Sequence, residues 1–162
     1  MKKANTGVGL IEVLVSLVIL SVGLLGLLGL QTKVMQFNQG ALYQTRATVL
    51  AKDIMDRMRA NPQRANLYVS NFESAIPNAT DCATNTVICN TSQLANYDLA
   101  DWRNTIIRVL PDGKGQILTN GNPTNPVYII TLQYDDSRSV GATKFAQNNP
   151  IAPKQLTFRT AL

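Results

Sequence analysis

One carboxylate stands at the beginning of a long apolar stretch near the start of this 162-residue chain. Glu12 is followed by a run from Val13 to Thr32 with no charged residue, about the length that a helix needs to cross a hydrocarbon core of roughly 30 Å. An ionised group beside hydrocarbon is costly unless it finds a partner or reaches the interface. Glu12 is therefore either a functional group that meets a cation or a side chain that extends to the lipid headgroups.

The second pair of chemically distinctive residues is Cys82 and Cys89, the only two cysteines, which lie close together in a polar, loop-like stretch. Small domains outside the cytosol are often cross-linked, so a disulfide is the favoured interpretation. Two free thiols and half of a metal site are the alternatives. Since the chain has no histidine and no third cysteine, zinc is disfavoured, and we expect no metal and no cofactor.

No convincing catalytic arrangement occurs, so we expect a protein that is not an enzyme. Histidine is missing as a general base, and residues 113–115 (Gly-Lys-Gly) are too short for a phosphate-binding loop. Asp135 and Asp136 could bind a cation together with Asp112 if the fold joined them. Adjacent carboxylates at a strand end point to opposite faces, however, and are more typical of a solvated turn.

Charge and the N-terminal pattern indicate a membrane-anchored protein. The net charge of +5 comes from bases that are spread along the chain, which does not favour nucleic-acid binding. Lys2 and Lys3 precede an apolar run that is too long for a secretory signal and lacks a suitable cleavage site after it. We expect the N-terminus inside and, because of the expected disulfide, the C-terminal part in the periplasm or outside the cell.

Helical spacing continues beyond the apolar run, and no proline occurs before Pro62. We therefore predict one helix that ends near Asn61 and is about 80 Å long. Its second half is amphipathic and needs a sheet or another cover for its apolar stripe. The stripe consists of Val34, Phe37, Ala41, Ala47, Leu50, Ile54 and Met58.

After Pro62 the pattern changes to short elements. A second helix is predicted from one apolar face, followed by a turn at 111–115. The residues of that face are Leu99, Trp102, Ile106 and Val109. Strands are predicted at 127–134 and 155–160, with a weaker one at 117–118. The expected fold class is α+β, with a small antiparallel sheet laid over the long helix.

The N-terminal residues resemble the class III signal of type IV pilins and pseudopilins. Met1 to Gly7 form a short basic leader that ends in glycine, and Val8-Gly9-Leu10-Ile11-Glu12 opens the apolar run. The resemblance implies that a prepilin peptidase cuts between Gly7 and Val8 and that Val8 becomes N-methylated. It also implies that Glu12 pairs with the terminal amine of a neighbouring subunit during assembly. Val8 and Gly9 depart from the family, where phenylalanine and threonine are usual.

Three head segments resemble the minor pilins of the PilV type: Cys82-x6-Cys89, residues 96–102 (Asn-Tyr-Asp-Leu-Ala-Asp-Trp) and residues 110–115 (Leu-Pro-Asp-Gly-Lys-Gly). The strand that ends at 132–136 departs from that pattern, because tryptophan often precedes the acids there. The resemblance implies a type IV pilin-like fold with four parts. These are a leader at 1–7, a transmembrane and assembly helix at 8–32, its amphipathic continuation at 33–61 and a periplasmic head at 62–162.

The function implied by this resemblance is that of a minor pilin in the initiation and assembly of type IV pili, with effects on adhesion and twitching motility. The implied partners are other minor and major pilins, the prepilin peptidase and the inner-membrane assembly platform. The protein would span the inner membrane once and then enter a pilus at the cell surface. Two alternatives remain at this point: a pseudopilin of type II secretion, and a membrane-tethered periplasmic binding module.

Overall fold

The computed structural model describes residues 9–84, 88–122, 125–137 and 152–162. A long helix, a short 3-10 helix and a second helix are followed by three strands. The elements are α1 (Leu10–Ala60), η1 (Pro62–Tyr68), α2 (Thr91–Val109), β1 (Lys114–Thr119), β2 (Val127–Tyr134) and β3 (Lys154–Ala161).

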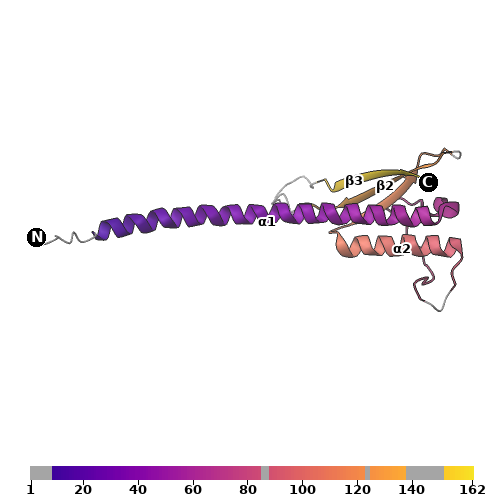
Figure 1. Ribbon diagram of the computed structural model, residues 1–162, viewed down its shortest axis with the longest axis horizontal. Helices are drawn as coiled ribbons and strands as arrows, with labels where there is room; N and C mark the ends of the chain where they lie inside the picture. Colours follow the sequence, from indigo (N-terminus) through magenta and orange to yellow (C-terminus); the bar gives the residue numbers. More distant parts are fainter. Residues whose placement is uncertain (1–8, 85–87, 123–124, 138–151) are drawn as a thin grey trace, which may run out of the picture.

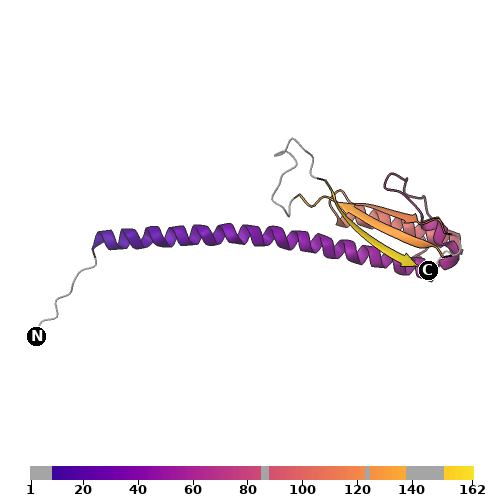
Figure 2. The same cartoon turned by 90° about the horizontal axis from the view of Figure 1, so that it is seen from above.

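Helix α1 is continuous over 51 residues, which corresponds to about 77 Å at 1.5 Å per residue. It ends at Ala60, in agreement with the predicted end near Asn61, and Pro62 opens η1 directly afterwards. Proline fits the first position of a helix because it has no N–H to leave unpaired. The N-terminal part of α1 extends away from the head, whereas the C-terminal part lies within it (Figures 1 and 2).

Helix α2 begins at a capping box. The side-chain oxygen of Asn90 accepts hydrogen bonds from the N–H groups of Ser92 (3.0 Å) and Gln93 (2.9 Å), and the Gln93 side chain accepts one from the Asn90 N–H. This exchange satisfies donors that a helix start otherwise leaves unpaired. The helix then runs back alongside α1 in the opposite direction (Figure 1).

The sheet is antiparallel, in the order β1-β2-β3. The predicted strands are confirmed, although the turn predicted at 111–115 is shorter than expected because Lys114 and Gly115 already pair with Gln133 and Leu132. Glycine is required in this strand because a Cβ at Gly115 would lie 2.5 Å from the indole ring of Trp102. Gly115, which the sequence pattern assigns to a turn, therefore lies in β1 where that strand approaches α2 most closely.

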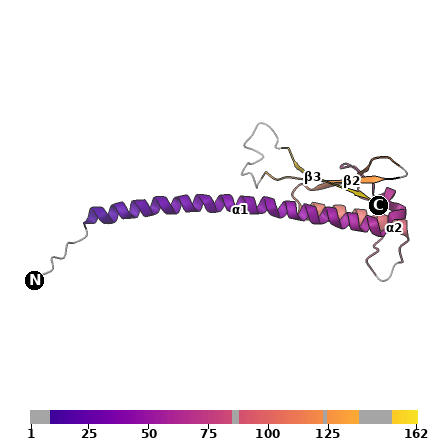
Figure 3. The ribbon, with the colours of Figure 1, turned by 45° about the horizontal axis from the view of Figure 1, so that its top comes forward.

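The core lies between the sheet and the two helices, with β1 against α2 and with β2 and β3 against α1 (Figure 3). This arrangement confirms the α+β fold of a long helix on a small antiparallel sheet. The largest fully buried side chains are Trp102, Tyr68, Tyr134, Ile54, Met58, Ile106, Leu110, Ile117, Ile130 and Leu132.

Burial of the predicted stripe on α1 begins later than expected. The described residues of α1 have no buried member before Gly40, and Val34 and Phe37 are 48% and 71% exposed. The expectation that the stripe is covered was wrong for its first three residues, of which Ala41 is the third. These residues stay exposed because the sheet and α2 pack only against the C-terminal part of α1 and do not extend to them.

Candidate functional site

Glu12 lies in the first turn of α1, three residues after the N-cap residue Gly9. Its backbone N–H donates to the Gly9 carbonyl oxygen at 2.9 Å, and the residue is exposed. A carboxylate in the first turn interacts favourably with the positive end of the helix dipole. The predicted cleavage and methylation positions, Gly7 and Val8, lie outside the described residues. The structure therefore places Glu12 at the exposed start of α1.

The segment that follows Glu12 is apolar and uncovered. Helix α1 is the one helix in the described part of the chain that is long and apolar enough to cross a membrane, and none of its most apolar stretch is buried. The hydroxyls of Ser16 and Ser21 donate to the carbonyl oxygens four residues earlier, at 2.7 and 2.6 Å. Both serine hydroxyls are thus satisfied within the helix, which suits an apolar surrounding.

Three glycines interrupt this segment without breaking the helix. A Cβ at Gly23, Gly26 or Gly29 would meet nothing within 4 Å in the isolated chain. Glycine weakens a helix by up to about 1 kcal/mol per residue relative to alanine. These positions therefore lower the local stability of α1 and leave shallow places on its surface.

Beyond the membrane-length stretch, α1 keeps an apolar row on the side away from the head. Met35, Leu42 and Val49 are spaced seven residues apart, so they share one face of the helix, and they are 46–66% exposed. The buried residues Ala47, Leu50 and Ile54 belong to another face. The C-terminal half of α1 thus has one face inside the head and one that remains uncovered.

A cluster of charges joins α1 to α2 inside the head. Arg57 contacts three carboxylates: Asp53 at 3.0 Å, Asp98 at 3.3 Å and Asp101 at 2.9 Å. Asp98 is 7% exposed and also accepts a hydrogen bond of 2.7 Å from the hydroxyl of Tyr68. Burial, followed by the bond to Asp98, raises the pKa of Tyr68. Partial burial opposes the charge of Arg57, but bonds to Asp101 and Asp53 outweigh this and raise its pKa.

Sequence reasoning missed this cluster, although a signal was present. Asp98 directly precedes Leu99, and both lie on the buried face of α2. A carboxylate on a buried face requires a partner, because an unpaired buried charge is strongly unfavourable. The sequence could have indicated the need for a cation, but the identity of Arg57 depends on how the two helices pack.

The Cys82–Cys89 pair forms a disulfide, with Cα atoms 5.8 Å apart. It closes part of the segment between η1 and α2, and Cys89 directly precedes the cap residue Asn90. The bond therefore restrains the chain just before α2 begins.

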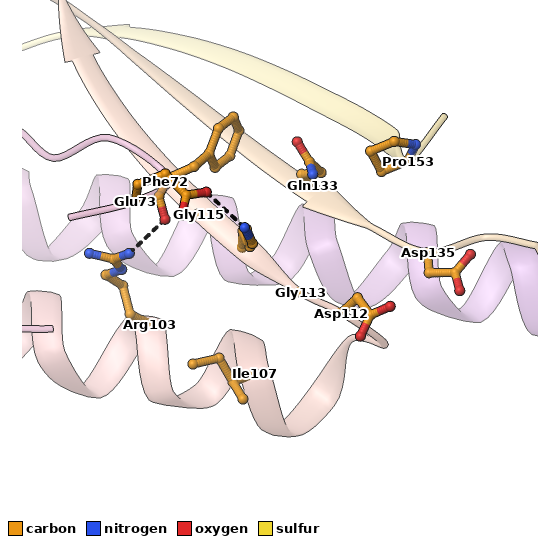
Figure 4. Close-up of a pocket in the computed structure, with 11 residues that line it drawn as sticks. Phe72, Glu73, Arg103, Ile107, Asp112, Gly113, Gly115, Gln133, Asp135 and Pro153 are labelled. Carbon is orange, nitrogen blue, oxygen red and sulfur yellow. Dashed lines mark hydrogen bonds and ion pairs between the residues drawn. The ribbon is translucent and has the colours of Figure 1, made fainter. Parts of the chain in front are cut away.

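An open groove of about 700 Å³ lies on the head, and Figure 4 shows the side chains that line it. Arg103 donates to the carbonyl oxygens of Phe72 (3.2 Å) and Ala75 (3.4 Å), and Lys114 pairs with Glu73 at 2.8 Å. Burial lowers the pKa of Arg103, whereas the contact with Lys114 lowers that of Glu73. The groove is lined by Phe72, Glu73, Arg103, Ile107, Asp112, Gly113, Lys114, Gly115, Gln133, Asp135 and Pro153.

The acids considered for a cation site are only partly brought together. Asp112 and Asp135 line the groove, whereas Asp136 pairs with Lys154 at 3.3 Å. Among the residues that the structure describes, no group of three histidine, cysteine, aspartate or glutamate side chains is arranged to hold a metal ion. The contacts of Arg103 and Lys114 instead fix the 72–75 segment against α2 and β1.

Comparison with known proteins returns two adjoining family matches. A model of the prokaryotic N-terminal methylation motif matches residues 2–28, and the family described as Type IV pilin Tt1218 matches residues 29–100. No curated protein and no solved structure matches the chain. Type IV pilins are structural proteins rather than enzymes, and the observed long helix on a small antiparallel sheet is consistent with their fold. Residues 29–100 are thus similar to the type IV pilin family and residues 2–28 to its N-terminal methylation motif, and the observed fold is consistent with that similarity.

Proposed function

We propose that this protein is a minor pilin of the PilV type, which takes part in the initiation and assembly of a type IV pilus. The observation that carries the proposal is the uncovered N-terminal part of α1, whose most apolar stretch has no residue buried by its own head. Such a surface needs lipid before assembly and other apolar helices afterwards. A helix bundle of pilins supplies that second environment.

In this proposal the leader is residues 1–7, and cleavage after Gly7 gives Val8 a new terminal amine that is then methylated. The Glu12 carboxylate forms an ion pair with the terminal amine of a neighbouring subunit as the two helices slide into register. A carboxylate in an apolar surrounding is stable only beside a cation. The transmembrane and assembly helix comprises residues 8–32, its continuation 33–61 and the head 62–162. The N-terminus lies in the cytoplasm and the head in the periplasm, where a disulfide persists.

The proposed partners are other minor and major pilins, the prepilin peptidase and the inner-membrane assembly platform. The exposed row of Met35, Leu42 and Val49 extends the apolar surface of α1 into the head region. This row gives each subunit a second strip for contact with neighbouring helices. Effects on adhesion and twitching motility would follow from altered assembly.

The test is to shear filaments from cells that carry a tagged chain and to compare the sheared fraction with the membrane fraction. We expect the mature chain in both, with an intact mass that lacks residues 1–7 and carries one added methyl group. Met1 still attached in assembled protein would refute the pilin proposal. Recovery that depends strictly on type II secretion would identify a pseudopilin, and full activity of a head released from α1 near Lys33 would identify a tethered binding module.

A further inference from the structure

The loop between β1 and β2 contains the only Asn-Gly pair of the chain, Asn120-Gly121. The side-chain oxygen of Asn120 accepts hydrogen bonds from the N–H groups of Asn122 at 3.2 Å and Val127 at 3.0 Å. The backbone N–H of Asn120 donates to the Val127 carbonyl oxygen at 3.0 Å. Asn120 therefore joins the ends of the two strands, and two donors hold its side-chain amide at an exposed position.

The hydrogen bond from Asn122 also brings together two atoms that can react with each other. It closes a ring of atoms that includes the side-chain carbon Cγ of Asn120 and the backbone nitrogen of Gly121. Closure of this ring folds the amide back over that nitrogen. Atoms that are held close together react faster than atoms that must first find each other.

Gly121 leaves the approach to its nitrogen open. Its φ of +74° lies in the region that favours glycine, and a Cβ at this position would meet nothing within 4 Å. The backbone N–H of Gly121 donates to the hydroxyl oxygen of the exposed Thr119 at 3.3 Å. The proton that this nitrogen loses during a reaction thus has an acceptor beside the solvent.

The two N–H donors also favour attack on the Asn120 amide. Attack on Cγ turns the side-chain carbonyl oxygen into an oxyanion, and N–H groups that already point at this oxygen stabilise the charge as it develops. One of the donors, Val127, is fixed as the first residue of β2 and pairs there with Ala161 on β3. That donor therefore needs no rearrangement when the charge appears.

We propose that Asn120 is a site of spontaneous deamidation, with Gly121 as the internal nucleophile. The backbone nitrogen of Gly121 forms a bond to Cγ of Asn120, the Cγ–Nδ2 bond breaks, and the proton from the nitrogen leaves with ammonia. Water then opens the resulting succinimide ring at either carbonyl carbon, which gives aspartate or isoaspartate. The reaction consumes water and releases ammonia, with no change of oxidation state.

The two products have different effects on the hairpin. Aspartate keeps an oxygen acceptor for the N–H groups of Asn122 and Val127 and adds a negative charge. Isoaspartate places an extra methylene group in the backbone directly after β1, so it shifts the acceptor away from both donors. The inference depends only on the geometry of this loop and is independent of the proposed role in assembly.

The experiment places a second Asn-Gly pair in the full chain as an internal reference. Ala79→Gly puts a glycine after Asn78, which is exposed and whose side chain has no hydrogen-bond partner among the described residues. The chain is incubated in detergent micelles at mildly alkaline pH and digested with trypsin. Mass spectrometry then follows Asn120 in the peptide 115–138 and Asn78 in the peptide 65–103.

We expect Asn120 to deamidate faster than Asn78 by about threefold to tenfold, which corresponds to stabilisation of the oxyanion by one to two hydrogen bonds. Isoaspartate should form beside aspartate, because only the succinimide route gives both. An equal or lower rate at Asn120, or aspartate without isoaspartate, would overturn the inference.

A second variant tests the donor. Val127→Pro removes the N–H that points to the Asn120 side chain and should lower the rate at Asn120 by about threefold, with Asn78 unchanged. Val127→Ala keeps the N–H and is the matched control. An unchanged or higher rate at Asn120 in Val127→Pro would contradict the role of the donors. Circular dichroism checks the fold, and the comparison of Asn120 with Asn78 decides the inference if proline disturbs the hairpin.

Discussion

The indole nitrogen of Trp102 donates a hydrogen bond of 2.8 Å to the carbonyl oxygen of Leu50, and this bond joins α2 to α1 in the centre of the head. Trp102 is the only tryptophan of the chain and is 0% exposed. Its ring also limits how closely β1 approaches α2, because Gly115 lies directly against it. One side chain therefore sets the distances among two helices and a strand.

The contact between Trp102 and Gly115 predicts coupled effects on stability. Gly115→Ala should lower the free energy of unfolding by about 1–3 kcal/mol, since the added methyl group overlaps the indole ring. In a Trp102→Phe background the same change should cost less, because the ring atoms closest to the new methyl group are gone. Chemical denaturation of the full chain in detergent micelles, followed by circular dichroism, measures this cycle. Strictly additive effects would contradict the contact.

The Arg57 cluster predicts different effects for buried and exposed acids. Asp98→Ala should destabilise the head by about 2–4 kcal/mol, because Tyr68 and Arg57 each lose a buried partner. Asp56→Ala is the matched control, since Asp56 pairs with Arg59 at 2.7 Å on the exposed side of α1, and it should cost at most about 0.5 kcal/mol. Trp102 fluorescence during denaturation reports both. Similar losses for the two variants would show that the cluster does not stabilise the head.

Two buried tyrosines predict a loss of stability at high pH. Burial, followed by the charge of Asp136, raises the pKa of Tyr134 from 10.0 to about 12, and the pKa of Tyr68 is raised as well. Because the folded pKa exceeds the unfolded one, this stabilisation is fully present below pH 10 and is lost as the pH rises through about 12. Denaturation midpoints between pH 9 and 12 test the direction, and Tyr134→Phe should make the decline shallower.

At neutral pH, Tyr134→Phe should leave stability unchanged or raise it. The Tyr134 hydroxyl is buried and has no hydrogen-bond partner among the described residues, so its removal ends an unfavourable desolvation. The phenyl ring keeps the contact with Tyr43, whose ring centroid lies 6.3 Å away. A loss of more than about 1 kcal/mol would mean that the hydroxyl is in fact satisfied.

The disulfide predicts a measurable but local stabilisation. Reduction of the Cys82–Cys89 disulfide should lower the free energy of unfolding by about 2–3 kcal/mol in the chain-entropy model. Trypsin leaves both cysteines in one peptide, from Ala65 to Arg103. That peptide should take up iodoacetamide only after reduction, with a mass increase of two carbamidomethyl groups. Alkylation without reductant in protein taken from the periplasm would contradict the bond.

Glu12 provides the test that separates assembly from anchoring. Glu12→Gln keeps the shape and removes the charge, so insertion and leader cleavage should persist while incorporation into sheared filaments falls. If Glu12 only extends to the headgroups, its neutralisation should leave incorporation unchanged or improve it. The measurement is the ratio of mature protein in sheared filaments to that in the membrane, beside the wild type. A wild-type ratio at equal cleavage would remove the pairing mechanism.

Local signals in the sequence were sufficient for α1 and β2. The absence of proline before Pro62 and the continuous helical spacing determined α1, and a run rich in β-branched and aromatic residues at 127–134 determined β2. Glu12 could be identified in the same way, because a lone acid beside an uncharged run of membrane length is visible without any structure. These features depend on neighbours in the chain.

Contacts between distant residues were decided only by the tertiary structure. Gly115 reads as a turn former, yet it lies in a strand because Trp102 needs the space. Asp98 reads as a surface acid, yet it is buried because Arg57 and Tyr68 reach it from α1 and η1. Which part of the α1 stripe is buried depends on how far the sheet and α2 extend along the helix. Sequence periodicity assigns a face to each residue, but the packing of separate elements determines which faces are covered.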